Sequence, residues 1–389
     1  MTAAGPGVFR LAGRVILGED REVSEAWVLG GKVTFERPRH SGPVTTLQGF
    51  VLPGLVDVHC HVGLTVGGAA EPDLAEKQAA ADRDSGVLLI RDAGSASDTS
   101  WINGRDELPR IIRAGQFLAR PKRYIRGYAR ELESVDELPA AAEEEARSST
   151  ANAPGATGDP RTSGWVKVIA DWIDRDGGAA ADLAPLWPRE TLKLAVDRAH
   201  AAGARVTAHT FATESIDDLL DAGVDCLEHG TGMTATQINR AAASGIPVVP
   251  TLLQVGEFAS IAAQGEQKYP VFSARMRGMY ERRYAQARAF HEAGVPLLVG
   301  TDAGGSIGHG ALPEEAAELV VAGIPPAVVV AAASWRAREF LGAPGIEEGA
   351  SADLVVYPDD PRVDITALAR PSVILLRGIV ANLPPLGRG

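Results

Sequence analysis

The sequence contains only two cysteines, Cys60 and Cys226, among its 389 residues. Two thiols cannot build a disulfide framework, so a reducing compartment fits this chain. The first residues show no basic start followed by an apolar run, and no segment approaches the roughly 18 to 20 apolar residues of a membrane span. We therefore expect a cytoplasmic location and no membrane partner.

Positive charge is also scarce, because 38 Lys and Arg residues face 50 Asp and Glu residues, for a formal net charge of -12. This balance argues against a protein that binds nucleic acid electrostatically. Hydrophobic residues make up 45% and charged residues 23%, which is ordinary for a globular protein. We expect a small-molecule substrate, and the composition leaves open whether the chain forms a homo-oligomer.

The middle of the chain alternates short apolar runs with Ala-rich amphipathic stretches. Near-continuous apolar runs separated by helices are typical of buried parallel strands. Eight such units predict a (β/α)8 TIM barrel. A doubly wound open sheet is the competing fold, but it rarely needs eight repeats. The runs begin near Leu55, Gly86, Arg123, Trp165, Ala204, Val224, Pro247 and Pro296.

The two ends of the chain have a different pattern. Residues 8–50 contain short alternating runs with glycine turns, and ADLVVYP and SVILLRGIVA near the end resemble them. We expect residues 1–51 and 348–389 to form a small antiparallel β-sandwich domain, with the barrel at 52–347. The Gly/Pro-rich stretch 151–164 precedes a strand, so we expect it opposite the active site. The loops at 175–188 and 254–270 follow strands and should build its walls.

Histidines recur where the predicted strands end. His59 and His61 lie on the first, His209 on the fifth and His229 on the sixth, and Asp302 closes the eighth. A single strand histidine is more often structural, but the carboxyl ends of barrel strands converge on one mouth. Imidazole and carboxylate together suit zinc or a similar ion. Because side chains alternate along a strand, Cys60 should point away from His59 and His61 and pack.

Lys167 stands inside an apolar strand, WVKVIAD, where an ammonium is costly to bury. In one interpretation it pairs with an acid such as Asp171. In the other, burial lowers the pKa of the amine, which becomes nucleophilic. A neutral amine can capture carbon dioxide as a carbamate, whose two oxygens can bridge two metal ions.

Several segments resemble the amidohydrolase superfamily across nearly the whole chain. GFVLPGLVDVHCHVGL resembles the start of its barrel, with the His-X-His motif. VTAHTFATESIDDLLDAGVDCLEHG and AGVPLLVGTDAG resemble the imidazolonepropionase-like branch, which includes metallo-dipeptidases and ochratoxin-degrading amidases. The resemblance implies two divalent ions, taken as Zn2+. Their implied ligands are His59 and His61 for the more buried ion, His209 and His229 for the second, N6-carboxylated Lys167 as the bridge, and Asp302 on the first ion.

The same resemblance implies a reaction. A hydroxide bridging the two ions would attack a carbonyl, with Asp302 moving the proton to the leaving nitrogen. This chemistry cleaves an amide, cyclic amide or related C–N bond, for example in a dipeptide or N-acyl amino acid. The alternatives are a mononuclear deaminase or imidazolone-type ring hydrolase, a lactone or ester hydrolase, and a non-enzymatic scaffold.

The substrate contacts depart from the family pattern. Related dipeptidases carry Gly-Gly-His after the third strand and a tyrosine after the fifth-strand histidine, whereas this chain has RGYARE and HTFAT. An arginine in RGYARE, such as Arg126 or Arg130, could bind a substrate carboxylate. It could instead form a surface salt bridge. Trp172 and Trp187 could wall an apolar group or pack in the core. The candidate substrate contacts are Arg126, Tyr128, Trp172, Phe211 and His309.

Overall fold

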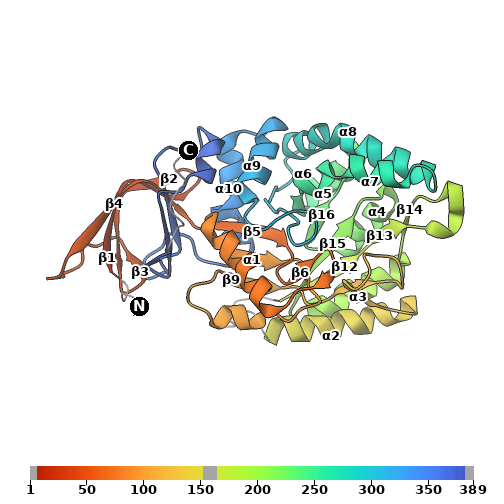
Figure 1. The fold of residues 1–389 in the computed structure, drawn as a ribbon, viewed down its shortest axis with the longest axis horizontal. Coiled ribbons are helices and arrows are strands. Elements are labelled where there is room, and N and C mark those ends of the chain that lie inside the picture. The colour runs from red at the N-terminus through yellow and green to blue at the C-terminus, as the bar shows by residue number, and fades with distance from the viewer. Residues whose placement is uncertain (1–6, 152–163, 382–389) are drawn as a thin grey trace.

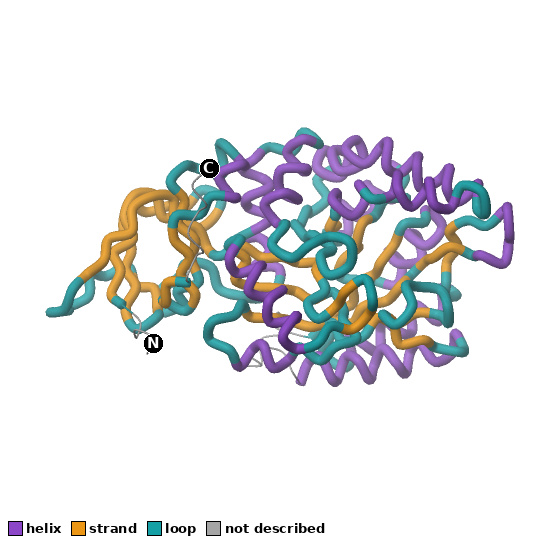
Figure 2. Tube along the Cα trace, viewed as in Figure 1, coloured by secondary structure: helices purple, strands orange, loops and turns teal. Residues whose placement is uncertain are grey.

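The computed structural model describes residues 7–151 and 164–381, and these form two regions (Figure 1). One region is a sheet built from both ends of the chain, which we call the terminal sheet. The other is an α/β region, in which helices cover parallel strands (Figure 2). Residues 152–163, nearly all of the stretch predicted to lie opposite the active site, fall outside the described residues.

The terminal sheet has seven strands in the spatial order β20-β19-β18-β4-β1-β2-β3. Their bounds are β1 (Val8–Gly18), β2 (Arg21–Leu29), β3 (Lys32–Thr34), β4 (Val44–Pro53), β18 (Leu354–Tyr357), β19 (Val373–Leu376) and β20 (Ile379–Val380). Strands β18 and β4 pair antiparallel, which joins the two ends of the chain in one sheet.

This sheet differs from the predicted antiparallel β-sandwich, because it is one mixed sheet in which β1 and β4 run parallel. Its apolar side chains, among them Leu11, Val28 and Leu354, pack into a core of their own. Between β1 and β4 the backbones approach so closely that a Cβ on Gly13 would lie 2.4 Å from the oxygen of Gly49. Gly13 also has φ +116°, which only glycine adopts easily.

The parallel strands of the α/β region form two sheets. One has the order β5-β8-β9 and the other β11-β10-β12-β15-β16-β17. Most of their residues are buried, as expected for strands covered on both faces. The bounds are β5 (Leu55–Cys60), β8 (Val87–Asp92), β9 (Arg110–Arg113), β10 (Phe117–Ala119), β11 (Ala129–Glu131), β12 (Trp165–Ile169), β15 (Arg205–Thr210), β16 (Cys226–His229) and β17 (Val248–Val249).

Backbone contacts connect the two sheets. Strands β9 and β10 are consecutive in the chain, separated only by residues 114–116. On the other side, residues 296–303 run between β17 and β5. Leu298 N donates to Val248 O at 3.1 Å, and Val58 N donates to Val299 O at 3.1 Å. The parallel strands therefore surround a common interior.

Two of the eight strand predictions need correction. The run starting at Arg123 is not a strand, because residues 123–128 form turns in which Gly127 has φ +81°. The chain enters the sheets earlier, through β9 and β10, whose short runs gave a weaker apolar signal. The eighth predicted strand, from Pro296, makes only isolated bridges, at Leu297 with β17 and at Ala303 with β5.

The helices lie around these strands (Figures 1 and 2). Their bounds are α1 (Pro72–Asp84), α2 (Leu138–Ala151), α3 (Arg189–Ala201), α4 (Thr213–Ala222), α5 (Ala235–Ser244), α6 (Leu252–Gly256), α7 (Phe258–Gly265), α8 (Pro270–Glu292), α9 (Leu312–Val321), α10 (Pro326–Ala333) and α11 (Trp335–Phe340). Two short hairpins, β6 (Leu64–Thr65) with β7 (Gly68–Ala69) and β13 (Asp171–Ile173) with β14 (Leu183–Pro185), follow β5 and β12.

The interior between the strands is filled in layers. Near the strand N-termini lies an apolar cluster that includes Val56, Leu89, Trp165 and Leu298 and contacts α11. The guanidinium of Arg91 lies 4.6 Å above the Trp165 ring. The histidines come next, towards the carboxyl ends of the strands. One interior thus changes from apolar to ionic along the strands.

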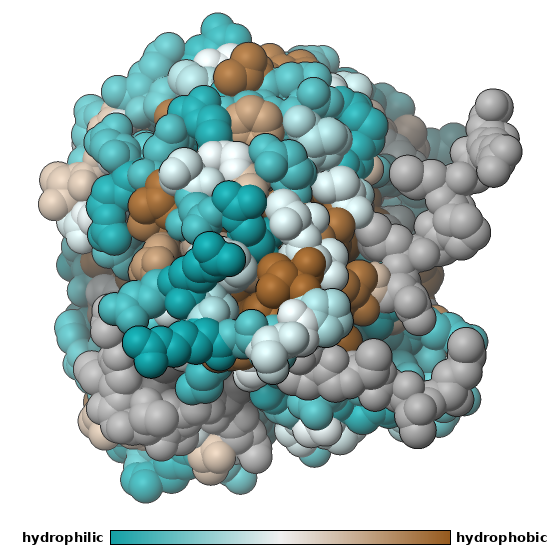
Figure 3. All heavy atoms as spheres, turned by 90° about the vertical axis from the view of Figure 1, so that its left-hand side faces the viewer, coloured by the Kyte–Doolittle hydropathy of each residue, from teal (hydrophilic) through white to brown (hydrophobic). Residues whose placement is uncertain are grey.

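The surface of the described residues has few extended apolar segments. Among the described residues, no helix combines the length and apolarity needed to cross a membrane. Figure 3 looks onto the terminal-sheet side and shows apolar residues scattered in a mostly hydrophilic surface. Exposed apolar side chains of that sheet include Leu29, Val44 and Val380. Single exposed apolar residues of this kind are normal for a folded protein.

Candidate active site

The structure brings four histidines and one aspartate together at the carboxyl ends of the parallel strands. His61 Nε2 lies 2.9 Å from Asp302 Oδ1, and His59 Nε2 lies 3.3 Å from the same oxygen. His209 Nδ1 lies 3.0 Å from His229 Nε2. One ligand atom each from His59, His229 and Asp302 fit within 4.8 Å of one another. These residues form the histidine cluster.

The backbone at this cluster is unusual. Among the described residues, five non-glycine residues have positive φ, and three of them are His229, Thr251 and Asp302, with φ of 67°, 47° and 59°. Such conformations cost about 1 to 3 kcal/mol each and collect at functional sites. The amide of Asp302 donates to His59 O at 2.6 Å, which fixes the position of the carboxylate.

In three of the histidines, one ring nitrogen lies within hydrogen-bonding distance of a protein oxygen. His59 Nδ1 lies 2.7 Å from Glu228 Oε2, and His61 Nδ1 lies 2.7 Å from Gly94 O. His229 Nδ1 lies 2.7 Å from Thr251 Oγ1, whose own proton goes to Pro250 O. In each of these rings Nδ1 is therefore directed at a protein oxygen, and Nε2 is the nitrogen that faces the cluster. This is the usual arrangement of histidines that bind metal.

Lys167 lies among these residues with its Nζ buried and without a hydrogen-bond partner among the described residues. The alternative pairing with Asp171 is wrong, because Asp171 accepts from Thr210 Oγ1 at 2.8 Å and Ser215 Oγ at 2.6 Å. Burial lowers the pKa of the Lys167 amine. His209 Nε2 is likewise buried without a partner. Two buried nitrogens without a partner among the described residues are donors that a metal ion and a carboxylated lysine would satisfy.

The charges of the site match metal binding. Burial, together with the nearby His229 and Lys167, holds the pKa of His209 well below its usual value. Burial does the same to His229. Both rings are therefore neutral, which is the ligand form. For Asp302, burial alone would raise the pKa, but His59 and His61 outweigh it and hold the pKa well below the usual range.

Sequence reasoning missed two residues beneath the cluster, Glu228 and Arg91. Both are fully buried, and Arg91 Nη2 donates to Glu228 Oε1 at 2.5 Å. Thr207 Oγ1 also donates to Glu228. Simple alternation along β16 places Glu228 opposite His229, so the two were not expected at one site. The positive φ of His229 breaks that alternation, and both side chains contact His59.

A cavity of about 320 Å3 opens directly beside the histidine cluster. Three of the five predicted substrate contacts line it, namely Tyr128, Trp172 and Phe211, whereas Arg126 and His309 do not. The two loops predicted as walls supply Arg175, Leu183, Gln254, Ile261 and Tyr269. The full lining is His61, Tyr124, Ile125, Tyr128, Trp172, Ile173, Arg175, Leu183, His209, Phe211, Gln254, Ile261, Tyr269, Phe272, Met276, Asp302, Gly305 and Ser306.

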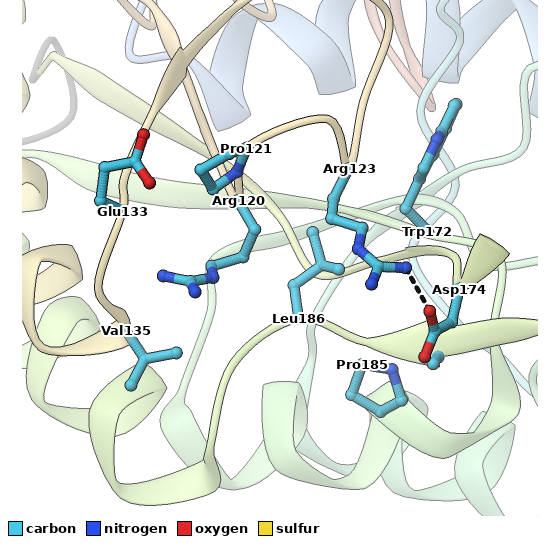
Figure 4. Close-up of a pocket in the computed structure, with 10 residues that line it drawn as sticks. Arg120, Pro121, Arg123, Glu133, Val135, Trp172, Asp174, Pro185 and Leu186 are labelled. Carbon is cyan, nitrogen blue, oxygen red and sulfur yellow. Dashed lines mark hydrogen bonds and ion pairs between the residues drawn. The ribbon is translucent and has the colours of Figure 1, made fainter. Parts of the chain in front are cut away.

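A larger cavity of about 510 Å3 lies on another side of Trp172 and contains none of the six proposed ligands (Figure 4). Its walls include Arg120, Arg123 and Asp174, and Arg123 is held by Asp174 at 2.5 Å and Asp176 at 2.8 Å. Arg120 also donates to Leu132 O at 2.9 Å. Because both arginines have partners and the wall contains no histidine, the smaller cavity is the better candidate for chemistry.

Of the remaining predicted residues, Arg126 is exposed, and the others have structural partners. His309 Nδ1 lies 2.8 Å from Asp82 Oδ2, in a group that also includes Cys60. Cys60 packs in the main apolar core, as its position in the strand predicted. Trp187 is buried and donates to Ile169 O at 2.7 Å. Arg130 pairs with Glu144 at 2.7 Å, the surface salt bridge left open above.

Known proteins resemble this chain over almost its full length. Uncharacterized proteins of Mycobacterium tuberculosis and Mycobacterium bovis are each 46% identical to it over 359 residues, 92% of this chain and 92% of theirs. A Xaa-Pro dipeptidase crystallised with methionine has a TM-score of 0.77 at 22% identity, covering 96% of this chain and 99% of its own. Ochratoxinase of A. niger has a TM-score of 0.76 at 19% identity, covering 99% and 98%.

At such low identities, the two solved structures show that the fold is shared, but they do not indicate the substrate of this chain. The family comparison goes further, because the model of the Amidohydrolase family matches residues 50–380. That range contains every residue of the histidine cluster and Lys167. This chain therefore belongs to the amidohydrolase family and is an enzyme.

Proposed function

We propose that this enzyme hydrolyses an amide, cyclic amide or related C–N bond at a centre of two divalent metal ions. The observation that supports it most is the convergence of His59, His61, His209, His229 and Asp302 beside the unpartnered Nζ of Lys167. The proposal includes the fold in which the two parallel sheets make one (β/α)8 barrel, and a domain division at residues 1–51 with 348–389 and at 52–347.

In the proposed centre, His59, His61 and Asp302 would hold one ion, and His209 and His229 would hold the other. Lys167, as N6-carboxylysine, would contribute oxygen ligands to both. Ions of this kind, with zinc as the first candidate, would supply Lewis acidity and lower the pKa of a bound water towards neutrality. The neutral rings of His209 and His229, and the Lys167 amine without a partner among the described residues, are donors that such ions need.

Asp302 is the residue proposed to move protons. As a carboxylate beside His59 and His61, it could accept a proton as the nucleophile forms. Its side chain is 16% exposed and lines the cavity, so it can reach the leaving nitrogen. Glu228 and Gly94 hold the first two histidines in place while this occurs.

Two alternatives differ in the number of ions or the bond cleaved. The compact group of His59, His229 and Asp302 would also fit a single ion, as in a mononuclear deaminase or ring hydrolase. A lactone or ester hydrolase would use the same centre. Membership of the amidohydrolase family argues against a non-enzymatic scaffold.

The Lys167→Ala variant tests the bridge. We expect it to lose metal, measured by mass spectrometry of metals, and to lose hydrolysis of a panel of N-acyl amino acids, dipeptides and lactams. Short carboxylic acids such as acetate should restore part of both, because a carboxylate can replace the carbamate oxygens. Lys193→Ala, which removes an exposed lysine that pairs with Asp197 on α3, is the matched control and should change neither. Full metal content and activity in Lys167→Ala would contradict the bridge.

A further inference from the structure

The cavity beside the histidine cluster has a composition that restricts what it can bind. Most of its lining side chains are aromatic or aliphatic, and among the described residues that line it only Asp302 carries a carboxylate. Asp302 already contacts His59 and His61. A cavity of about 320 Å3 lies at the lower end of the usual size for small-molecule sites.

The apolar wall starts at the cluster itself. The ring of His209 lies 4.3 Å from that of Phe211, 5.5 Å from that of Tyr124 and 5.7 Å from that of Trp172, measured between centroids. Phe211 is also 4.8 Å from Phe258, which anchors it to α7. An apolar substrate group in this cavity would therefore lie next to the histidine cluster.

The charges exclude one class of ligand. With Asp302 engaged by histidines, an ammonium in this cavity would have no free counter-charge and would be costly to desolvate. At the edge of the cavity, Arg175 is exposed and has no hydrogen bond or ion pair among the described residues. An anion or a neutral group is therefore favoured over a cation.

We propose that the substrate carries a large ring or branched alkyl group next to the scissile bond and no free amino group there. This group occupies the cavity between Trp172, Phe211 and Phe272. The inference rests on the proposed function for the bond that is cleaved, but it concerns the binding of the neighbouring group. N-acylated or arylated compounds fit it, and free dipeptides do not.

Binding without turnover tests the inference. Isothermal titration of the metal-loaded protein would compare 3-phenylpropionate with propionate, and phenethylamine serves as the cationic match. Burying a phenyl group should make 3-phenylpropionate bind about 10- to 100-fold more tightly than propionate. Phenethylamine should bind more weakly than 3-phenylpropionate.

Two variants locate the phenyl group. Phe272→Ala and Ile261→Ala each change a half-buried wall residue and should reduce the preference for 3-phenylpropionate about threefold or more. Leu194→Ala, which changes an exposed residue of α3 away from the cavity, should leave the preference unchanged. Circular dichroism would verify that each variant is folded.

Equal affinity for propionate and 3-phenylpropionate would overturn the inference, as would tighter binding of phenethylamine. A preference unaffected by both wall variants would overturn it as well. These outcomes are separate from the proposed function. A clear phenyl preference in a protein that does not hydrolyse amides would refute the proposed reaction alone, and amide hydrolysis without the preference would refute the cavity assignment alone.

Discussion

The two ends of the interior between the parallel strands are built from the same strands but from opposite kinds of side chain. On β12, Trp165 packs in the apolar cluster while Lys167, two residues later, lies without a partner among the described residues. On β16, Cys226 packs in that same cluster, and Glu228 and His229 stand in the ionic layer. Substitutions at the apolar end should therefore lower the stability of the fold, and substitutions at the ionic end should lower catalytic activity. This division is common among barrel enzymes.

The largest effect should come from Asp302→Asn. Asparagine tolerates positive φ, so the backbone at φ 59° should survive the change. Loss of the proposed proton carrier should lower kcat about 10²- to 10⁴-fold with little change in thermal stability. Steady-state kinetics with calorimetry measures both, and a fully active Asp302→Asn would remove Asp302 from the mechanism.

At the apolar end, Trp165→Ala should behave in the opposite way. Removing a fully buried indole should lower the free energy of unfolding by about 3 to 5 kcal/mol. The folded fraction should still bind metal, because the histidine cluster lies further along the strands. Urea unfolding and metal analysis would compare it with Lys167→Met, which should keep its stability and lose metal. If both variants lost stability equally, the two ends would not be distinct.

Glu228→Gln probes the boundary between the two ends. The amide would leave the buried Arg91 without its ion-pair partner and weaken the hold on His59 Nδ1. We expect metal affinity or activity to fall about 10- to 100-fold. Glu190→Gln, an exposed position at the start of α3, is the control. Unchanged metal affinity and unchanged activity would show that Glu228 has no role in positioning His59.

A further expected effect, outside the interior between the parallel strands, is a pH dependence of stability from Glu315. Burial raises the pKa of this carboxyl to about 8, against a usual value of 4.5. The folded state therefore binds the proton more tightly, and the free energy of unfolding should fall as the pH rises from about 4.5 to about 8, by at most about 1.4 kcal/mol per pH unit. Urea unfolding across this range should show a smaller decline in Glu315→Gln. An equal decline in both proteins would mean that Glu315 titrates normally.

The histidine cluster could be predicted from sequence because strand alternation and strand order are local properties. His59 and His61 are two residues apart on one strand, and Asp302 ends the last apolar run, so convergence followed from topology. Glu228 could not be predicted in the same way, since the positive φ of His229 overrides alternation. The contact between His59 and Glu228 therefore depends on the backbone conformation of His229.

The fold shows the same limit. The apolar runs of β5, β12 and β15 were long enough to predict, but β9 and β10 are short and are separated by Gly115 with φ +71°. The terminal sheet was misjudged because β1 and β4 pair in parallel across about 25 intervening residues. Pairing of distant segments leaves no periodic signal in either segment.

The central claim is a two-ion centre bridged by a modified Lys167, and one measurement addresses it directly. The purified enzyme would be labelled with 13C-bicarbonate, its carbamate signal recorded by NMR and its metal content determined on the same sample. The account predicts two ions per chain and a carbamate signal that disappears in Lys167→Met. A fully active enzyme with one ion and no carbamate signal would contradict it.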